Sequence, residues 1–143
     1  MMVDNVSKER RSEIMGAVKF KDTKPEMIVR RFLYKEGFRY RLHVKELPGK
    51  PDIVLRKYKT IIFVNGCFWH GHENCKIYMM PKSNISFWYE KITKNKARDK
   101  KNIEELNRLN WSVIIVWECQ LRKKMQRITL NRISKVLRTT YRK

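Results

Sequence analysis

The spacing of apolar and polar positions along the chain predicts an ordered series of helices and strands. A first helix is expected to open at residues 22–26, where Asp22 or Thr23 can cap it and proline lies in the first turn, and to stop at Gly37. Three strands are expected after it, over residues 38–44, 51–56 and 60–65. The remaining elements are a long helix over 87–109, a buried strand over 111–117 and a basic C-terminal helix.

The order of these elements predicts an α/β fold in which helices flank a central mixed β-sheet. The chain has 143 residues, a usual size for one domain, and contains no repeat, Gly/Ser linker or low-complexity tract. We therefore expect residues 22–143 to form a single domain that ends in the basic helix. Residues 1–21 are polar with a weak helical pattern, and we expect them to form an N-terminal arm.

The charge of the chain adds a partner to this fold. There are 34 lysines and arginines against 14 acidic residues, a net charge of +20, and residues 120–143 contain nine basic residues and no acid. Such a surplus promotes binding to a polyanion through counterion release, so we predict nucleic-acid binding, with the N-terminal arm in contact with DNA. A basic surface that serves only solubility is the alternative. An anionic membrane fits less well, because no segment pairs a basic face with a strongly apolar one.

No segment predicts membrane insertion or export. The longest apolar runs, residues 60–64 and 113–117, have the length of strands and are far shorter than a membrane span. The N-terminus lacks a basic region followed by an apolar one, so no signal peptide is visible and the protein is expected in the cytoplasm. Three cysteines in a cytoplasmic protein are core thiols or metal ligands rather than a disulfide framework.

Cysteines and histidines concentrate in one loop. Residues 67–75 contain two of the three cysteines and two of the three histidines, and Cys119 directly follows the predicted buried strand. Four such ligands suit tetrahedral Zn²⁺ in a closed, structural site, although the spacing is not that of a standard zinc finger. If all three cysteines bind, only one of His70 and His72 can complete the site, and the other is left for another role. Two loop thiols and a buried Cys119 are the alternative.

Three carboxylates are candidates for catalysis. Asp52 opens a predicted strand at the exposed edge of the sheet, as the Mg²⁺-binding acids of PD-(D/E)xK nucleases do, although an ordinary turn aspartate explains it equally well. The next strand lacks the acid and the lysine that this superfamily places there. Asp99 falls on the apolar stripe of the long helix, where a carboxylate needs a cation, a base or water; a salt bridge to a nearby lysine is the alternative. Glu26 lies in a first helical turn, where the helix dipole explains an acid at least as well as catalysis does.

Large aromatic residues lie in or beside the Cys/His loop, at Phe68, Trp69 and Trp88. In a basic protein such side chains can stack on bases or wedge between base pairs. They can equally form a small core around a zinc site.

Five sequence motifs together resemble the very-short-patch (Vsr-like) DNA mismatch endonucleases. They are Pro48–Asp52, Val64–His72, Phe87–Ile92, Lys94-Asn95 with Arg98-Asp99, and Trp111–Cys119. The resemblance runs from about Ser7 to Leu121, with its spacing preserved almost throughout. It implies a restriction-endonuclease-like PD-(D/E)xK fold that lacks the usual second acid and lysine, in agreement with their absence from residues 63–65.

The resemblance also implies a role for each candidate residue. Asp52 and the backbone carbonyl of Val64 would bind the catalytic Mg²⁺, and His70 would activate the attacking water or carry its proton. Glu26 and Asp99 would position metal-bound waters or the histidine. Zinc would be bound by four residues: Cys67, His72, Cys75 and Cys119. Three aromatic residues would wedge into DNA beside the mismatch: Phe68, Trp69 and Trp88.

Two departures from the family pattern are visible. Asn65 stands where the best-known branch has a second active-site histidine, and an amide can orient a metal-bound water but does not titrate near neutral pH. One additional residue lies between His72 and Cys75. Neither change removes the residues of the expected active site.

The function expected from the sequence is therefore Mg²⁺-dependent nicking of one strand of double-stranded DNA, next to a T:G mismatch, by a monomer. A restriction- or invasion-type endonuclease that cuts matched sites is the second interpretation. A zinc-stabilised nucleic-acid-binding module without catalysis is the third.

Overall fold

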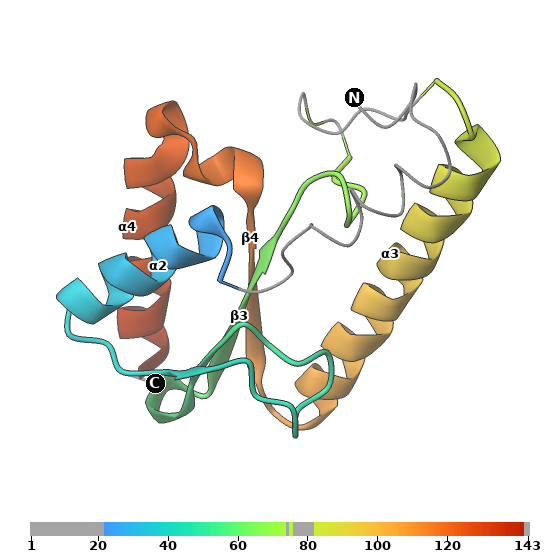
Figure 1. The fold of residues 1–143 in the computed structure, drawn as a ribbon. Helices are drawn as coiled ribbons and strands as arrows, with labels where there is room; N and C mark the ends of the chain where they lie inside the picture. The colour runs from blue at the N-terminus through green and yellow to red at the C-terminus, as the bar shows by residue number, and fades with distance from the viewer. Residues whose placement is uncertain (1–21, 74, 76–81, 142–143) are drawn as a thin grey trace.

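The computed structural model describes residues 22–73, 75 and 82–141 (Figure 1). The predicted N-terminal arm, residues 1–21, lies outside the described residues. The described elements are, in order, helix α2 (Lys24–Lys35), strands β1 (Arg41–Leu42) and β2 (Ile53–Leu55), the 3₁₀ turn η2 (Arg56–Tyr58), strand β3 (Thr60–Asn65), helix α3 (Ile85–Arg108), strand β4 (Ser112–Trp117), the 3₁₀ turn η3 (Glu118–Leu121) and helix α4 (Lys123–Tyr141).

The four strands form one sheet in the order β1-β2-β3-β4. β1 pairs antiparallel with β2 and β2 antiparallel with β3, whereas β3 and β4 run parallel with Ile62 opposite Ile114. A parallel pair requires a long crossover connection, and α3 lies within it. The predicted α/β fold with a mixed central sheet is confirmed.

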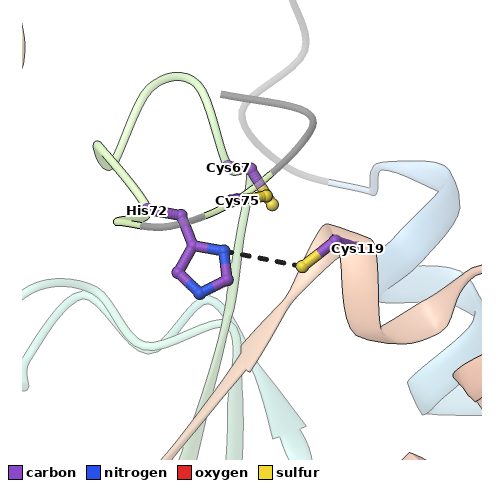
Figure 2. A group of neighbouring side chains, drawn as sticks. All are labelled: Cys67, His72, Cys75 and Cys119. Carbon is purple, nitrogen blue, oxygen red and sulfur yellow. Dashed lines mark hydrogen bonds between the residues drawn. The ribbon is translucent and has the colours of Figure 1, made fainter. Parts of the chain in front are cut away.

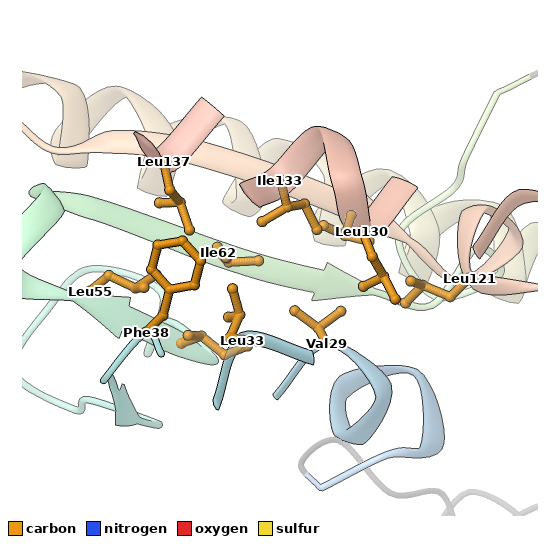
Figure 3. Packing of buried hydrophobic residues seen from close by; sticks show 11 residues of the cluster. Val29, Leu33, Phe38, Leu55, Ile62, Leu121, Leu130, Ile133 and Leu137 are labelled. Carbon is orange, nitrogen blue, oxygen red and sulfur yellow. The ribbon is translucent and has the colours of Figure 1, made fainter. Parts of the chain in front are cut away.

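Helices cover both faces of the sheet. α2 and α4 lie on one side of β3 and β4, and α3 lies on the other (Figure 1). The main core fills the space between the sheet and the pair α2 and α4, and its buried residues are Val29, Leu33, Phe38, Ile53, Leu55, Ile62, Val116, Leu121, Leu130, Ile133 and Leu137 (Figure 3). Burial of a side chain of this size contributes about 1.5–3 kcal/mol. Because α4 supplies three of these residues, the basic C-terminal helix is part of the core.

A smaller core lies on the face of the sheet that α3 covers, and its buried residues are Val44, Val54, Ile61 and Leu106. Successive residues of a strand point to opposite faces, so Ile53 belongs to one core and Val54 to the other. β2 and the first half of β3 are thus buried on both faces. This explains why both segments are continuous apolar runs rather than alternating ones.

The first described helix begins and ends as its sequence predicts. The Thr23 hydroxyl accepts a hydrogen bond from the Glu26 amide at 3.3 Å, and proline lies in the first turn. Gly37 follows the helix with a φ of 92°, a conformation that residues with a Cβ rarely adopt. The cap therefore fixes the position of Glu26 relative to the start of α2.

The expected strand over residues 38–44 is wrong in length, because only Arg41 and Leu42 pair with β2. His43 has a left-handed backbone with a φ of 48°, which ends the extended conformation. β2 is also shorter than expected, since residues 56–58 form a 3₁₀ turn. The strand over residues 60–65 has the expected bounds, and the long helix begins two residues earlier than expected.

Among the helices of the described residues, none is long and apolar enough to cross a membrane.

Candidate active site and metal centre

A cleft of about 950 Å³ opens between the end of β3 and α3. Five of the residues predicted for the active site line it: Asp52, Val64, Asn65, His70 and Asp99. Four basic residues line the same cleft: Lys45, Lys50, Lys91 and Arg98. Cations around acidic and imidazole groups are the arrangement expected for a site that binds a phosphate backbone and acts on it.

Asp52 lies immediately before β2, and its carboxylate points towards β3. Its Oδ2 atom accepts a hydrogen bond of 2.8 Å from the Val64 amide. The side chain is only 16% exposed, so Asp52 is largely buried beside an internal strand and does not lie at an exposed sheet edge as expected. Burial raises the pKa of this carboxyl from 3.8 to about 6, although the Val64 hydrogen bond opposes the rise. A cation beside Asp52 would favour its ionised form, which makes Asp52 suited to bind a metal ion.

His70 and Asp99 form a close pair within the cleft. The Nδ1 atom of His70, in the loop after β3, lies 2.6 Å from Oδ2 of Asp99 on α3. Gly71 allows this contact, because it has a φ of 59° and a Cβ there would lie 2.7 Å from Cγ2 of Ile92. A neutral imidazole that donates a hydrogen bond from Nδ1 has its free lone pair on Nε2, the form that accepts a proton. The inward position expected for Asp99 thus brings it to a histidine rather than to a lysine.

Glu26 is 2% exposed and lies in a network of charged groups at the start of α2. Its Oε2 atom lies 3.1 Å from Nη1 of Arg30, and the same Nη1 lies 2.7 Å from Oδ1 of Asp22. The Asp22 amide also donates a hydrogen bond to Oε1 of Glu26 at 3.2 Å. Glu26 does not line the cleft, but its negative charge raises the pKa of Asp52. The helix dipole alone therefore does not explain why an acid lies at this position.

Two residues of this site were missed by the sequence interpretation. His43 lies between Glu26 and Asp52 and lines the cleft. Asn95 is buried on α3 and donates a hydrogen bond of 2.9 Å from Nδ2 to the Trp69 carbonyl, which holds the loop that carries His70. A signal for His43 existed, because it is the one histidine outside residues 67–75 and lies opposite Asp52 if the two predicted strands pair.

Cys67, His72, Cys75 and Cys119 come together in one cluster (Figure 2). One ligand atom from each residue lies within 4.8 Å of the others, and Sγ of Cys119 is 3.5 Å from Nδ1 of His72. The His72 ring stacks on Trp117 with its centroid 4.0 Å away and an interplanar angle of 6°. These four groups are the residues predicted to bind zinc, and His70 lies outside the cluster.

The cluster is chemically suited to a soft divalent cation. None of its three thiols is in a disulfide. Desolvation raises the pKa of the Cys67 thiol to about 12 and also raises the pKa of Cys119. A thiol binds metal as its thiolate, so a bound cation would reverse these shifts. Three sulfur atoms and one imidazole nitrogen match the donor set of closed, four-coordinate metal sites.

The three predicted DNA-contacting aromatic residues pack against one another. Ring centroids are 5.2 Å apart for Phe68 and Trp69, 5.5 Å for Phe68 and Trp88, and 5.9 Å for Trp69 and Trp88, all edge to face. Trp88 is only 1% exposed, whereas Phe87 beside it is 45% exposed. Phe68 and Trp69 are half-buried, and Trp69 lines the cleft. Trp88 is therefore the buried member of the cluster, against which Phe68 and Trp69 pack.

Several known proteins are similar in sequence to this chain over most of its length. The family model described as DNA mismatch endonuclease Vsr matches residues 3–76. A Type II nicking enzyme of Neisseria meningitidis, V.NmeAIP, is 52% identical over 92% of this chain and 94% of its own. The Xanthomonas oryzae nicking enzyme V.XorIIP is 47% identical over 84% and 88% of the two chains. The DNA mismatch endonuclease Vsr of Escherichia coli is 42% identical over 85% and 77%. At this level of identity, the chain belongs to the Vsr family of DNA endonucleases.

Proposed function

We propose that this endonuclease nicks one strand of double-stranded DNA next to a T:G mismatch, with Mg²⁺ at Asp52 and a structural Zn²⁺ nearby. The observation that carries the proposal is the cleft in which Asp52 and the pair His70 and Asp99 face the same space among four cations. Nicking and mismatch recognition are supported by the names of relatives, which are Type II nicking enzymes and a DNA mismatch endonuclease.

The residues around Asp52 fit a hard divalent cation. Its carboxylate would hold Mg²⁺ together with the backbone carbonyl of Val64, the residue whose amide donates a hydrogen bond of 2.8 Å to Asp52 and so lies beside it. When bound there, Mg²⁺ would stabilise the negative charge that develops on the phosphate and favour ionisation of a water molecule. Asn65 is buried at the end of β3 and lines the cleft, where its amide can orient a water molecule.

The proton of the attacking water is assigned to His70. Asp99 holds Nδ1 of His70 in place and stabilises the imidazolium that forms when Nε2 accepts the proton. Glu26, which does not line the cleft, would raise the pKa of Asp52 through its negative charge. Lys45, Lys50, Lys91 and Arg98 would bind the phosphates on either side of the cut.

We assign Zn²⁺ to the four-residue cluster in a structural role. The four residues would fill all the positions of a tetrahedral ion, which would leave none for substrate. The cluster joins the loop after β3 to the start of η3, so the ion would hold the His70 loop against the end of β4.

We assign mismatch selection to the aromatic cluster. Phosphate contacts carry no sequence information, so a preference for a mispaired site must come from base contacts or from the energy of deforming the duplex. Opening a base step to admit an aromatic ring costs a few kcal/mol, and a weakened pair lowers that cost. Trp69 would be one such ring, because it lines the same cleft as Asp52 and His70.

The protein would act as a monomer on cytoplasmic DNA, because one active site per chain is enough to nick one strand.

The test is a gel assay on a duplex with one T:G mismatch and a different label on each strand. We expect Mg²⁺ to be required and one labelled strand to be shortened, with Asp52→Asn inactive but still able to bind. Breaks in both strands of a matched duplex would favour a restriction-type endonuclease. Binding without cleavage by the wild-type protein in Mg²⁺ or Mn²⁺ would favour a non-catalytic module.

A further inference from the structure

His43 occupies a strained backbone position at the point where β1 ends. Its φ of 48° lies in the left-handed region, which is uncommon for residues other than glycine. Its amide donates a hydrogen bond of 3.1 Å to the Asp52 carbonyl, so the residue is held directly opposite Asp52. Other non-glycine residues among those described, such as Lys59 and Asn110, also have a positive φ, so the contacts of its side chain are what distinguish His43.

The imidazole of His43 reaches carboxylates on two different elements. Its Nε2 atom lies 3.1 Å from Oε2 of Glu26 and 3.4 Å from Oδ1 of Asp22, at the start of α2. Its Nδ1 atom lies 3.9 Å from Oδ1 of Asp52, at the start of β2. The ring therefore lies between the buried Glu26, 3.1 Å away, and the Asp52 oxygen atom that the Val64 amide does not bind, 3.9 Å away.

A role as a metal ligand fits His43 less well. The ligand atoms of Asp22, Glu26 and His43 do lie within 4.8 Å of one another. However, Nη1 of Arg30 already brings a permanent positive charge to both carboxylates, at 2.7 Å from Asp22 and 3.1 Å from Glu26. A second cation at this point would be repelled by the guanidinium.

We propose that His43 is a positioning residue that orients the Asp52 carboxylate and links it to Glu26 for metal binding. The inference rests on the proposed function, because it takes Asp52 as the ligand of the catalytic metal. Groups that orient a metal ligand typically change metal affinity or activity by about 10–100-fold when they are removed. His43 should act through Asp52 and should not contact DNA bases.

The experiment compares His43→Ala, His43→Asn and His43→Gln with the wild-type protein. Asparagine tolerates the left-handed backbone but is too short to reach both carboxylates, whereas glutamine is longer and retains a donor and an acceptor. Glu46→Ala, at an exposed position in the same segment, is the matched control. Binding of Mn²⁺ to the DNA-free protein is measured by calorimetry, and kcat and KM are measured for nicking.

We expect Mn²⁺ to bind roughly tenfold more weakly to the alanine and asparagine variants, with kcat reduced and KM for DNA unchanged. The glutamine variant should recover most of the affinity, and Glu46→Ala should match the wild type. Recovery by asparagine as well would show that only the backbone conformation matters and would overturn the proposal. Unchanged Mn²⁺ affinity in all three variants would also overturn it.

Asp52→Asn separates failure of this inference from failure of the proposed function. If Asp52→Asn loses Mn²⁺ binding and cleavage while His43→Ala keeps both, the inference about His43 is wrong and the proposed active site stands. If Asp52→Asn itself keeps both, the proposed metal site is wrong, and the inference falls with it.

Discussion

The Nδ1 atom of His70 lies 2.6 Å from Oδ2 of Asp99, although the two residues are 29 positions apart in the chain. The loop after β3 supplies the imidazole and α3 supplies the carboxylate. A carboxylate in this position selects the ring tautomer in which Nε2 can accept a proton. The proposed role of His70 as the base depends on this contact.

Asp99→Asn should therefore lower kcat by about two orders of magnitude or more, because an amide can stabilise the wrong tautomer and cannot stabilise an imidazolium. Affinity for DNA should change little, since many cations share the binding. Single-turnover nicking and a binding titration at fixed salt measure the two quantities. Glu104→Gln, an exposed change on the same helix, is the control. Equal rates for Asp99→Asn and the control would exclude the proposed pair.

Two histidines two positions apart should behave differently towards zinc. His72→Ala should lower the zinc content well below one ion per chain and lower Tm by on the order of 10 °C, since a structural site contributes several kcal/mol to folding. His70→Ala should keep its zinc and its Tm but lose activity. Elemental analysis and thermal unfolding decide between them. A zinc-free wild-type protein with full stability would contradict a structural zinc.

The burial of Asp52 predicts that ionising its carboxyl lowers the free energy of unfolding of the metal-free protein. Its pKa rises from 3.8 to about 6, so the folded state binds the proton more tightly than the unfolded state. Between about pH 4 and 6 this contribution destabilises the fold progressively as pH rises, reaching at most about 3 kcal/mol above pH 6.

Asp52→Asn removes this cost, because an amide does not ionise. Urea unfolding without Mg²⁺ should find the variant more stable than the wild type at pH 8, with a difference that shrinks towards pH 4. Mg²⁺ should stabilise the wild type at pH 8 and leave the variant unchanged. If the difference in unfolding free energy between the two proteins stayed constant across this pH range, the pKa of Asp52 would not be raised in the folded protein.

The aromatic residues should separate into structural and functional members. Trp88 is 1% exposed, so Trp88→Ala should lower the free energy of unfolding by about 3–5 kcal/mol. Phe87 is 45% exposed, and Phe87→Ala should cost much less stability. Chemical denaturation measures both. If the two variants were equally stable, Trp88 would not be the supporting residue that its burial indicates.

Local sequence patterns predicted most of the elements. The Thr23 cap, Gly37 and the apolar run of β3 act within a few residues of where they stand, so α2 and β3 were expected with nearly correct bounds. Of the strand expected over residues 38–44, only Arg41 and Leu42 form a strand, and the extended conformation ends at His43. Its left-handed backbone accompanies contacts with Glu26 and Asp52, and such long-range contacts leave no periodic signal in the sequence.

The candidate site was predictable to the extent that residue chemistry is visible without packing. Three cysteines with a nearby histidine indicate a metal site wherever the fold brings them together, and Cys119 does join the loop. The pairing of Asp99 with His70 rather than with a lysine depends on how the loop packs on α3. The burial of Trp88 likewise depends on packing, because the aromatic residues around it are provided by the loop as well as by its own helix.

The most direct test of the proposed function is the ratio of nicking rates on two duplexes that differ only in a T:G or a T:A pair. Rates are measured at one salt concentration, because DNA affinity depends steeply on ionic strength. We predict nicking of the T:G duplex at least roughly tenfold faster, about 1.4 kcal/mol of transition-state discrimination, with a smaller ratio for Trp69→Ala. Equal rates on the two duplexes, or cutting of both strands, would contradict a mismatch-directed nicking enzyme.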